Sequence, residues 1–140
     1  MAEKQAAKTL KKEAVPEAVG MYPYWVAAAG WLVPGLGHLL LKKRDRAAVF
    51  FVSIGAMAVL GLASGGHLFS IDLGSPFDTL GFLADLCAGG FYFAARILGR
   101  GTGDIGQACG DYGTVFFLTA GLLNLLCCLD AYDIAVGKKE

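Results

Sequence analysis

Long stretches of this chain contain no basic residue at all. There is no Lys or Arg between Arg46 and Arg96, and none between Arg100 and Lys138. Charged residues make up 17% of the chain, which is too little to cover the surface of a soluble domain of this size. Such a distribution is typical of a multi-pass membrane protein, because charges are costly in hydrocarbon. The basic residues lie in four short groups: Lys4, Lys8, Lys11 and Lys12; residues 42–46; Arg96 and Arg100; and Lys138 and Lys139.

The chain also lacks the residue patterns of most catalytic and cofactor sites. Its four cysteines form no C-x-x-C pair, and no second His lies three or four residues from either His38 or His67. There is no nucleophile elbow, and no basic stripe interleaved with aromatic residues. We therefore expect no catalytic residue, metal, cofactor or nucleic-acid partner. The expected partners are the lipid bilayer and either further copies of this chain or other membrane proteins.

What the chain does have is four apolar blocks of helix length. At 1.5 Å per residue these blocks are about 24–27 Å long, near the short limit for crossing a membrane. We predict an all-α integral membrane bundle of about four hydrophobic helices, formed by residues 24–41, 47–63, 80–95 and 113–129. The predicted organisation is a polar tail, a single transmembrane domain and a basic end, at residues 1–20, 21–137 and 138–140 respectively.

The first apolar block contains its own helix breaker. Pro34 removes a helical hydrogen bond, and Gly35 and Gly37 relax the backbone around it, so the first helix should be kinked or broken at 34–37. Trp25 and Trp31 give the same block an aromatic edge of the kind found at membrane interfaces.

The basic groups predict a topology but leave part of it open. Residues 42–46 and 96–100 should be cytoplasmic, and loop 64–79, which has no Lys or Arg, should lie outside. The second and third blocks then cross as a pair. If the first and fourth blocks also span, both termini lie outside. If both termini are cytoplasmic, those two blocks enter and return or lie at the interface. We favour four spanning helices.

Five polar side chains within or next to the apolar blocks are candidate functional residues, because such groups in a membrane mark ion paths or helix contacts. Asp85 is expected either to be interfacial or to contact His38, Asn124 or a backbone amide of another helix. Asp130 and Asp133 share a helix face with Asn124. They form either a cation or proton site or an anchor at the headgroups beside the C-terminal lysines, and we favour the anchor.

Two motifs resemble known families. Residues 34–38 (PGLGH), followed by LLL and a basic turn, are similar to the P-G-x-G-H/Q-x-Y-x-G signature of small bacterial membrane proteins related to the two-transmembrane-helix domain family. Leu40 replaces the usual aromatic residue, and Lys42 or Lys43 stands where the closing Gly is expected. Residues 121–139 resemble the closing segment of an uncharacterised bacterial family, a domain of unknown function. The resemblance implies a multi-pass helical protein of the bacterial inner membrane and brings no known activity.

Three functions follow as hypotheses. The favoured one is a non-enzymatic accessory or assembly subunit, since polar groups are few and small residues recur at helical spacing. The alternative is a small ion, proton or solute transporter or channel-like protein that uses Asp85, Asn124 and Asp130. A membrane enzyme acting on lipid through His38 and an aspartate is the least favoured, because no motif links those residues.

Overall fold

The structure, a computed structural model, describes residues 21–104 and 106–138, and its regular secondary structure there is helical. Within these ranges the non-helical pairing is one isolated antiparallel bridge between His67 and Thr102. The predicted all-α class is therefore confirmed, while the predicted polar tail lies outside the described residues. The helices are α2 (Tyr22–Leu32), α3 (Leu36–Leu40), α4 (Arg44–Ala63), α5 (Pro76–Cys87), α6 (Gly90–Ile97) and α7 (Ala108–Ala135).

Two of these helices, α4 and α7, are each long and apolar enough to cross a membrane. With 20 and 28 residues, they are about 30 and 42 Å long, and the hydrocarbon core of a bilayer is about 30 Å thick. Helices α5 and α6 meet this criterion only as a pair, and that pair is bent by 106° at its break. The membrane-type bundle is thus confirmed, but the favoured prediction of four spanning helices is corrected to two, or three if the bent pair counts as one span.

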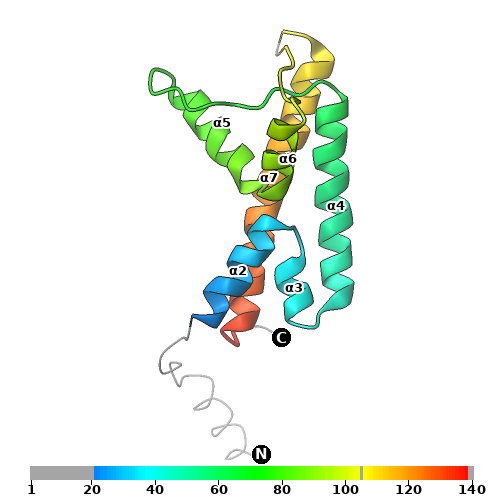
Figure 1. The fold of residues 1–140 in the computed structure, drawn as a ribbon, viewed down its shortest axis with the longest axis vertical. Helices are drawn as coiled ribbons and strands as arrows, with labels where there is room; N and C mark the ends of the chain where they lie inside the picture. Colours follow the sequence, from blue (N-terminus) through cyan, green and yellow to red (C-terminus); the bar gives the residue numbers. More distant parts are fainter. Residues whose placement is uncertain (1–20, 105, 139–140) are drawn as a thin grey trace, which may run out of the picture.

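The first apolar block forms a helical hairpin, here called the first hairpin (α2 and α3). Figure 1 shows α2 rising into the molecule and α3 returning toward the end from which α2 starts. The break begins at Val33, whose backbone is extended, and Pro34 supplies no N–H to continue a helix. Gly35 adopts a left-handed φ of 82°, and a Cβ there would overlap the carbonyl oxygen of Ala47 on α4. The predicted break at this position is confirmed.

The third apolar block forms the second hairpin (α5 and α6). Its first arm begins with a cap, because the Ser75 hydroxyl accepts a hydrogen bond from the Asp78 amide at 3.3 Å. After Cys87 the chain turns through Gly89, which has a φ of 59°. A Cβ on Gly89 would overlap the carbonyl oxygen of Trp31. The tips of the two hairpins therefore touch backbone to backbone.

The second hairpin returns to the end of the molecule where it starts. The Leu68 amide donates to the Gly101 carbonyl at 2.9 Å, which ties the loop before the hairpin to the loop after it. The Arg96 guanidinium also donates to the backbone of the first of these loops. The prediction that loop 64–79 lies on the opposite side from Arg96 and Arg100 is therefore wrong, because the segment between them bends back.

The opposite end of the molecule holds both described chain ends. The Tyr24 ring lies 5.5 Å from the Tyr132 ring, so the start of α2 is beside the end of α7. The turn between α3 and α4, which contains Lys42 and Lys43, lies at this end as well (Figure 1).

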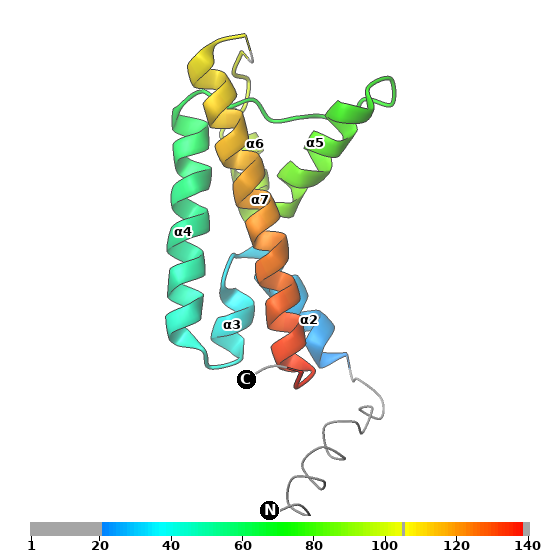
Figure 2. The same ribbon diagram turned by 180° about the vertical axis from the view of Figure 1, so that it is seen from behind.

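Each half of the chain consists of a hairpin followed by a long helix, and the two halves run in opposite directions (Figure 2). The long helices also share a sequence pattern. Residues 49–55 read VFFVSIG in α4, and residues 115–121 read VFFLTAG in α7. Inverted repeats of this kind, with a broken helical segment in each half, are a recurrent architecture of membrane transporters.

The long helices α4 and α7 pack closely where a glycine lies at their contact. A Cβ on Gly61 of α4 would lie 2.7 Å from the Gly113 carbonyl oxygen and 2.9 Å from the Phe117 amide of α7. Below this contact the buried core includes Ile54, Phe117 and Ala120. Because α4 and α7 form a close pair, they provide the frame against which both hairpins are placed.

Candidate functional site

Polar side chains on the buried face of α7 hold the other elements in position. Thr114 lies near its start, Asn124 in its middle and Asp130 near its end. The Thr114 hydroxyl accepts a hydrogen bond from the His67 amide at 2.8 Å, and it donates to the Gly110 carbonyl. This contact fixes the loop that follows α4. The two contacts further along α7 involve the hairpins.

Asn124 joins the tips of both hairpins. Its side-chain amide donates to the Trp31 carbonyl at 3.0 Å and to the Cys87 carbonyl at 2.9 Å. Both carbonyls lie in the last turns of their helices, where backbone oxygens have no partner within the helix. The Trp31 indole N–H completes the contact by donating to the Leu86 carbonyl at 3.0 Å. One side chain thus satisfies two helix ends at once.

Glycines allow this approach. A Cβ on Gly121, one turn before Asn124, would overlap the Ala84 carbonyl oxygen of α5. A Cβ on Gly90 would overlap the Leu32 carbonyl oxygen of α2. The C-terminal ends of two short helices, each carrying a partial negative charge, therefore meet beside the middle of α7. Asn124 is completely buried, and its Oδ1 accepts no hydrogen bond from the described residues.

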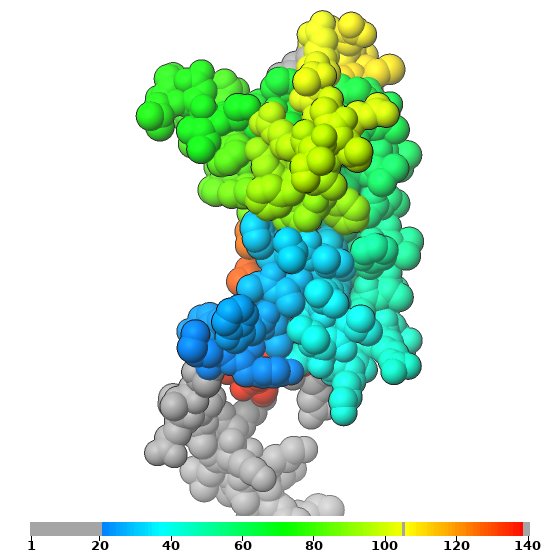
Figure 3. Space-filling view, viewed as in Figure 1, coloured from blue at the N-terminus to red at the C-terminus, as the bar shows by residue number. Residues whose placement is uncertain are grey.

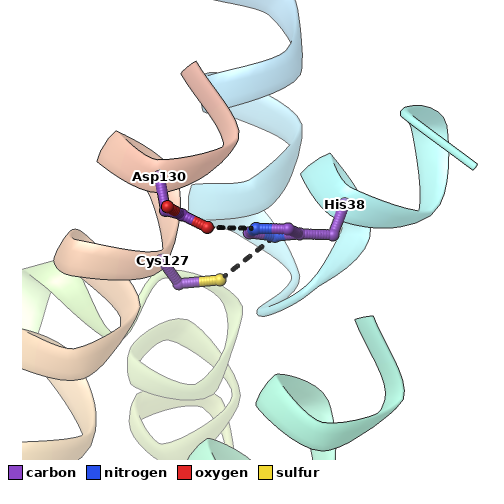
Figure 4. Close-up of polar contacts among 3 residues, drawn as sticks. All are labelled: His38, Cys127 and Asp130. Atoms are coloured by element: carbon purple, nitrogen blue, oxygen red, sulfur yellow. Dashed lines mark hydrogen bonds and ion pairs between the residues drawn. The ribbon is translucent and has the colours of Figure 1, made fainter. Parts of the chain in front are cut away.

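The second contact lies nearer the end of α7 and joins His38, Cys127 and Asp130 (Figure 4). The His38 Nε2 is 3.0 Å from Asp130 Oδ2, and its Nδ1 is 3.6 Å from Cys127 Sγ. His38 is fully buried, with its ring 4.9 Å from the Phe50 ring. Figure 4 shows the imidazole directed from α3 toward the two α7 side chains.

The motif before His38 explains how the imidazole reaches α7. Gly37 lies in the wedge between α2 and α7, where a Cβ would be 2.9 Å from the Val26 carbonyl oxygen and 3.0 Å from the Ala131 Cβ. A side chain there would push α3 outward and carry His38 with it. No motif in the sequence links His38 to an aspartate, yet His38 and Asp130, 92 residues apart in the chain, are in direct contact.

Asp85 lies in the last turn of α5 and meets neither His38 nor Asn124 in a hydrogen bond given by the structure. Its Oδ2 accepts from the Phe69 amide at 2.7 Å, which agrees with the expected backbone-amide contact, although the amide belongs to a loop. Arg96 donates to the Phe69 carbonyl at 2.9 Å and to the Ser70 hydroxyl at 2.9 Å. The Asp85 carboxylate thus accepts from the Phe69 N–H, and the Arg96 guanidinium donates to the Phe69 carbonyl. Asp85 is fully buried, and its Oδ1 has no hydrogen-bond partner among the described residues.

Asp130 and Asp133 have different roles in the structure. Asp130 contacts His38, whereas Asp133 forms an ion pair with Lys138 at 4.0 Å. The anchoring interpretation therefore fits Asp133, and the site interpretation fits Asp130. Both aspartates line a cleft of about 560 Å³ between α4 and α7, together with Cys127. No group of three His, Cys, Asp or Glu residues in the described part of the chain is arranged to hold a metal ion.

The sequence interpretation missed two members of these contacts. Trp31 was assigned to a membrane interface, but it lies at the hairpin tip and binds the second hairpin. Cys127 was treated as one of the unpatterned cysteines, but it lies against His38. The repeated motif at 49–55 and 115–121 was the signal in the sequence that could have predicted the second hairpin. It indicates two equivalent halves, so a break in the first apolar block predicts a matching break in the third.

Comparison with known proteins adds a family but no function. The model of a family of unknown function, DUF6677, matches residues 25–140, and the chain belongs to this family. No curated protein and no solved structure matches the chain.

Proposed function

We propose that this DUF6677 protein is a multi-pass protein of the bacterial inner membrane that moves protons or another small cation across it. The observation that carries the proposal is the meeting of two hairpins at Asn124, entering from opposite ends of the bundle. Transporters with inverted repeats place their ion sites where broken helices meet near the middle of the membrane, and helix C-terminal carbonyls there favour cations. The unpartnered Asn124 Oδ1 adds a further oxygen to that place.

Buried ionisable groups on both sides of this junction support the same proposal. Asp85 lies toward the end that holds loop 64–79, and the His38–Asp130 pair lies toward the end that holds the chain termini. Burying such groups in a membrane is costly, and those that persist mark ion or proton paths. The proposed path therefore runs past Asp85, the hairpin tips and His38. It requires no covalent chemistry, so the proposed protein is not an enzyme.

The proposed topology follows from the charges at the two ends. The end with the chain termini carries five basic residues of the described range, and the opposite end carries two. The end with more Lys and Arg should be cytoplasmic, which places loop 64–79, Arg96 and Arg100 outside. The five are Lys42, Lys43, Arg44, Arg46 and Lys138, and the two are Arg96 and Arg100.

The transport test uses purified protein in liposomes. A potassium diffusion potential drives protons inward, and a trapped pH-sensitive dye reports their entry. We expect a flux above that of empty liposomes and a reduction of at least tenfold in Asp85→Asn. Thr119→Val is the matched control, since the Thr119 hydroxyl donates within its own helix to Val115 and removing it should leave the rate within twofold. Wild-type flux equal to that of empty liposomes would refute proton transport.

The topology is tested in intact cells. Ser70→Cys should react with a membrane-impermeant maleimide from outside, and Lys138→Cys should react only after permeabilisation. Labelling of both positions from outside would show that the chain crosses the membrane an even number of times between residues 70 and 138, and would contradict a single crossing there by α7.

A non-enzymatic assembly subunit is the second candidate, and the position of α5 favours it. Figure 3 shows α5 and the loop before it as a lobe that projects from the molecule. Between α5 and α7 lies an apolar cleft of about 500 Å³, lined by Phe77, Leu80, Leu83 and Leu122 among others. Recovery of the protein from mild detergent only at monomer mass, with no other chain, would count against this candidate.

A further inference from the structure

The contact of Cys127 with His38 and Asp130 has the arrangement of an assisted nucleophile. An ionised carboxylate only accepts hydrogen bonds, so Asp130 Oδ2 requires the hydrogen on His38 Nε2, 3.0 Å away. In the neutral imidazole the lone pair then lies on Nδ1, which faces Cys127 Sγ at 3.6 Å. The thiol is a nucleophile, the imidazole is its base, and the carboxylate holds the imidazole in the required tautomer.

The cleft beside the thiol has an apolar approach. Cys127 lines the cleft of about 560 Å³ between α4 and α7, a volume typical of sites for small molecules. Its other lining residues include Val49, Leu126 and Leu129, each of which is more than half exposed. In a membrane these exposed side chains face lipid, so the cleft opens toward acyl chains.

The position of Cys127 along α7 places the thiol near the membrane boundary. It lies eight residues before Ala135, which is about 12 Å from the end of the helix. α7 is also about 12 Å longer than the hydrocarbon core, and with this excess divided equally between its two ends the thiol lies about 6 Å below the headgroup level. The carbonyl of an amphiphilic acyl thioester lies at that level, with its chain in the hydrocarbon.

We propose that Cys127 is a self-acylation site that accepts a fatty acyl group from a long-chain acyl thioester, with His38 as base and Asp130 as its positioning residue. Cys127 Sγ attacks the thioester carbonyl carbon as its proton passes to His38 Nδ1. The carbon–sulfur bond to the leaving thiol then breaks, and the thiol departs with that proton. The products are the Cys127 thioester and a free thiol, with no change of oxidation state. This proposal shares His38 and Asp130 with the proposed cation path, but the acylation of Cys127 does not require cation transport.

The test compares single-cysteine chains that keep Cys127, Cys128 or Cys109, with the other cysteines replaced by Ala. Each is incubated in liposomes with palmitoyl coenzyme A, and intact mass measures the fraction carrying one acyl group. We expect the chain with Cys127 to react at least tenfold faster than either control. Cys109 controls for exposure of a thiol, because it is exposed, and Cys128 controls for position, because it follows Cys127 in the chain. Hydroxylamine should remove the added group, as it does from a thioester.

The roles of the two assisting residues are tested in the Cys127-only chain. His38→Ala should lower the rate at least tenfold, as expected for loss of a general base, and added imidazole should restore part of it. Asp130→Asn should also slow the reaction. Asp133→Asn is the matched control, because it removes the same charge from the same cleft without touching His38, and its rate should stay within twofold.

Two results would overturn the proposal. One is a Cys127-only chain that reacts no faster than the Cys109-only chain. The other is an equal loss of rate in Asp133→Asn and Asp130→Asn, which would make the effect one of charge in the cleft. Circular dichroism and thermal melting of each variant distinguish a lost reaction from a lost fold, and Cys127→Ser supplies a second variant with the least change in shape.

Discussion

Replacing Gly89 by Ala should separate the tips of the two hairpins. The added Cβ would overlap the carbonyl oxygen of Trp31, which is backbone and therefore unable to swing away. Gly99 offers a matched control on the same hairpin. Its φ of 64° is close to the 59° of Gly89, and a Cβ there would have no neighbour within 4 Å. Both substitutions put a side chain at a positive φ, and Gly89→Ala adds the contact with Trp31 to the cost of its own backbone geometry, with a ψ of −121°.

The expected magnitudes follow from this difference. An alanine at a positive φ costs about 1–2 kcal/mol in the left-handed helical conformation, and of order 1–3 kcal/mol in the conformation of Gly89, whose ψ is −121°. At Gly89 the overlap also breaks the three hydrogen bonds between the tips, two from Asn124 and one from Trp31. At about 0.6 kcal/mol for each side-chain hydrogen bond in a membrane protein, this adds about 2 kcal/mol. Gly89→Ala should therefore destabilise the fold by about 3–5 kcal/mol and Gly99→Ala by about 1–2 kcal/mol.

The free energy of unfolding is measured by titrating SDS into mixed micelles and following the helical circular dichroism signal. Tryptophan fluorescence gives a second probe, because Trp31 lies at the junction. Equal destabilisation of the two variants, within about 0.5 kcal/mol, would refute the contact between the hairpin tips and with it the inverted arrangement of the two halves.

Two other substitutions test single contacts of α7. Asn124→Leu keeps the branching of the side chain but removes both donated hydrogen bonds, so it should cost about 1–2 kcal/mol in the same titration, whereas Thr119→Val should change stability by less than about 0.5 kcal/mol. An unchanged stability of Asn124→Leu would contradict its role at the junction. Thr114→Val leaves the His67 amide without its acceptor, so exchange of this amide with deuterium should quicken about fivefold, equivalent to about 1 kcal/mol. Exchange at the wild-type rate would show that the hydroxyl does not hold the loop.

Part of the fold could be predicted from the sequence because it depends on local chemistry. The distribution of Lys and Arg identified a membrane-type protein, and Pro34 with Gly35 located the break in the first block. The break in the third block was missed, since Gly89 follows an Ala and precedes another Gly with no proline to mark it. Its left-handed backbone matters only because Trp31 of the other hairpin lies against it.

The candidate sites depended on distance in space, which the sequence does not contain. Asp85 and Arg96 both belong to the second hairpin, and the bend between α5 and α6 allows both to bind Phe69. His38 and Asp130 carry no shared motif and meet only because the first hairpin turns back onto α7.

The sequence by itself determined that the chain suits a membrane, that it is helical, and that the first helix must break at Pro34. These features depend on the hydration of charged groups and on backbone geometry, which act residue by residue. The tertiary structure alone decided which way each broken segment turns. That direction depends on whether two helix ends find donors for their free carbonyls. Asn124 supplies those donors to residues 93 and 37 positions away in the chain, and its amide is what brings the two halves together.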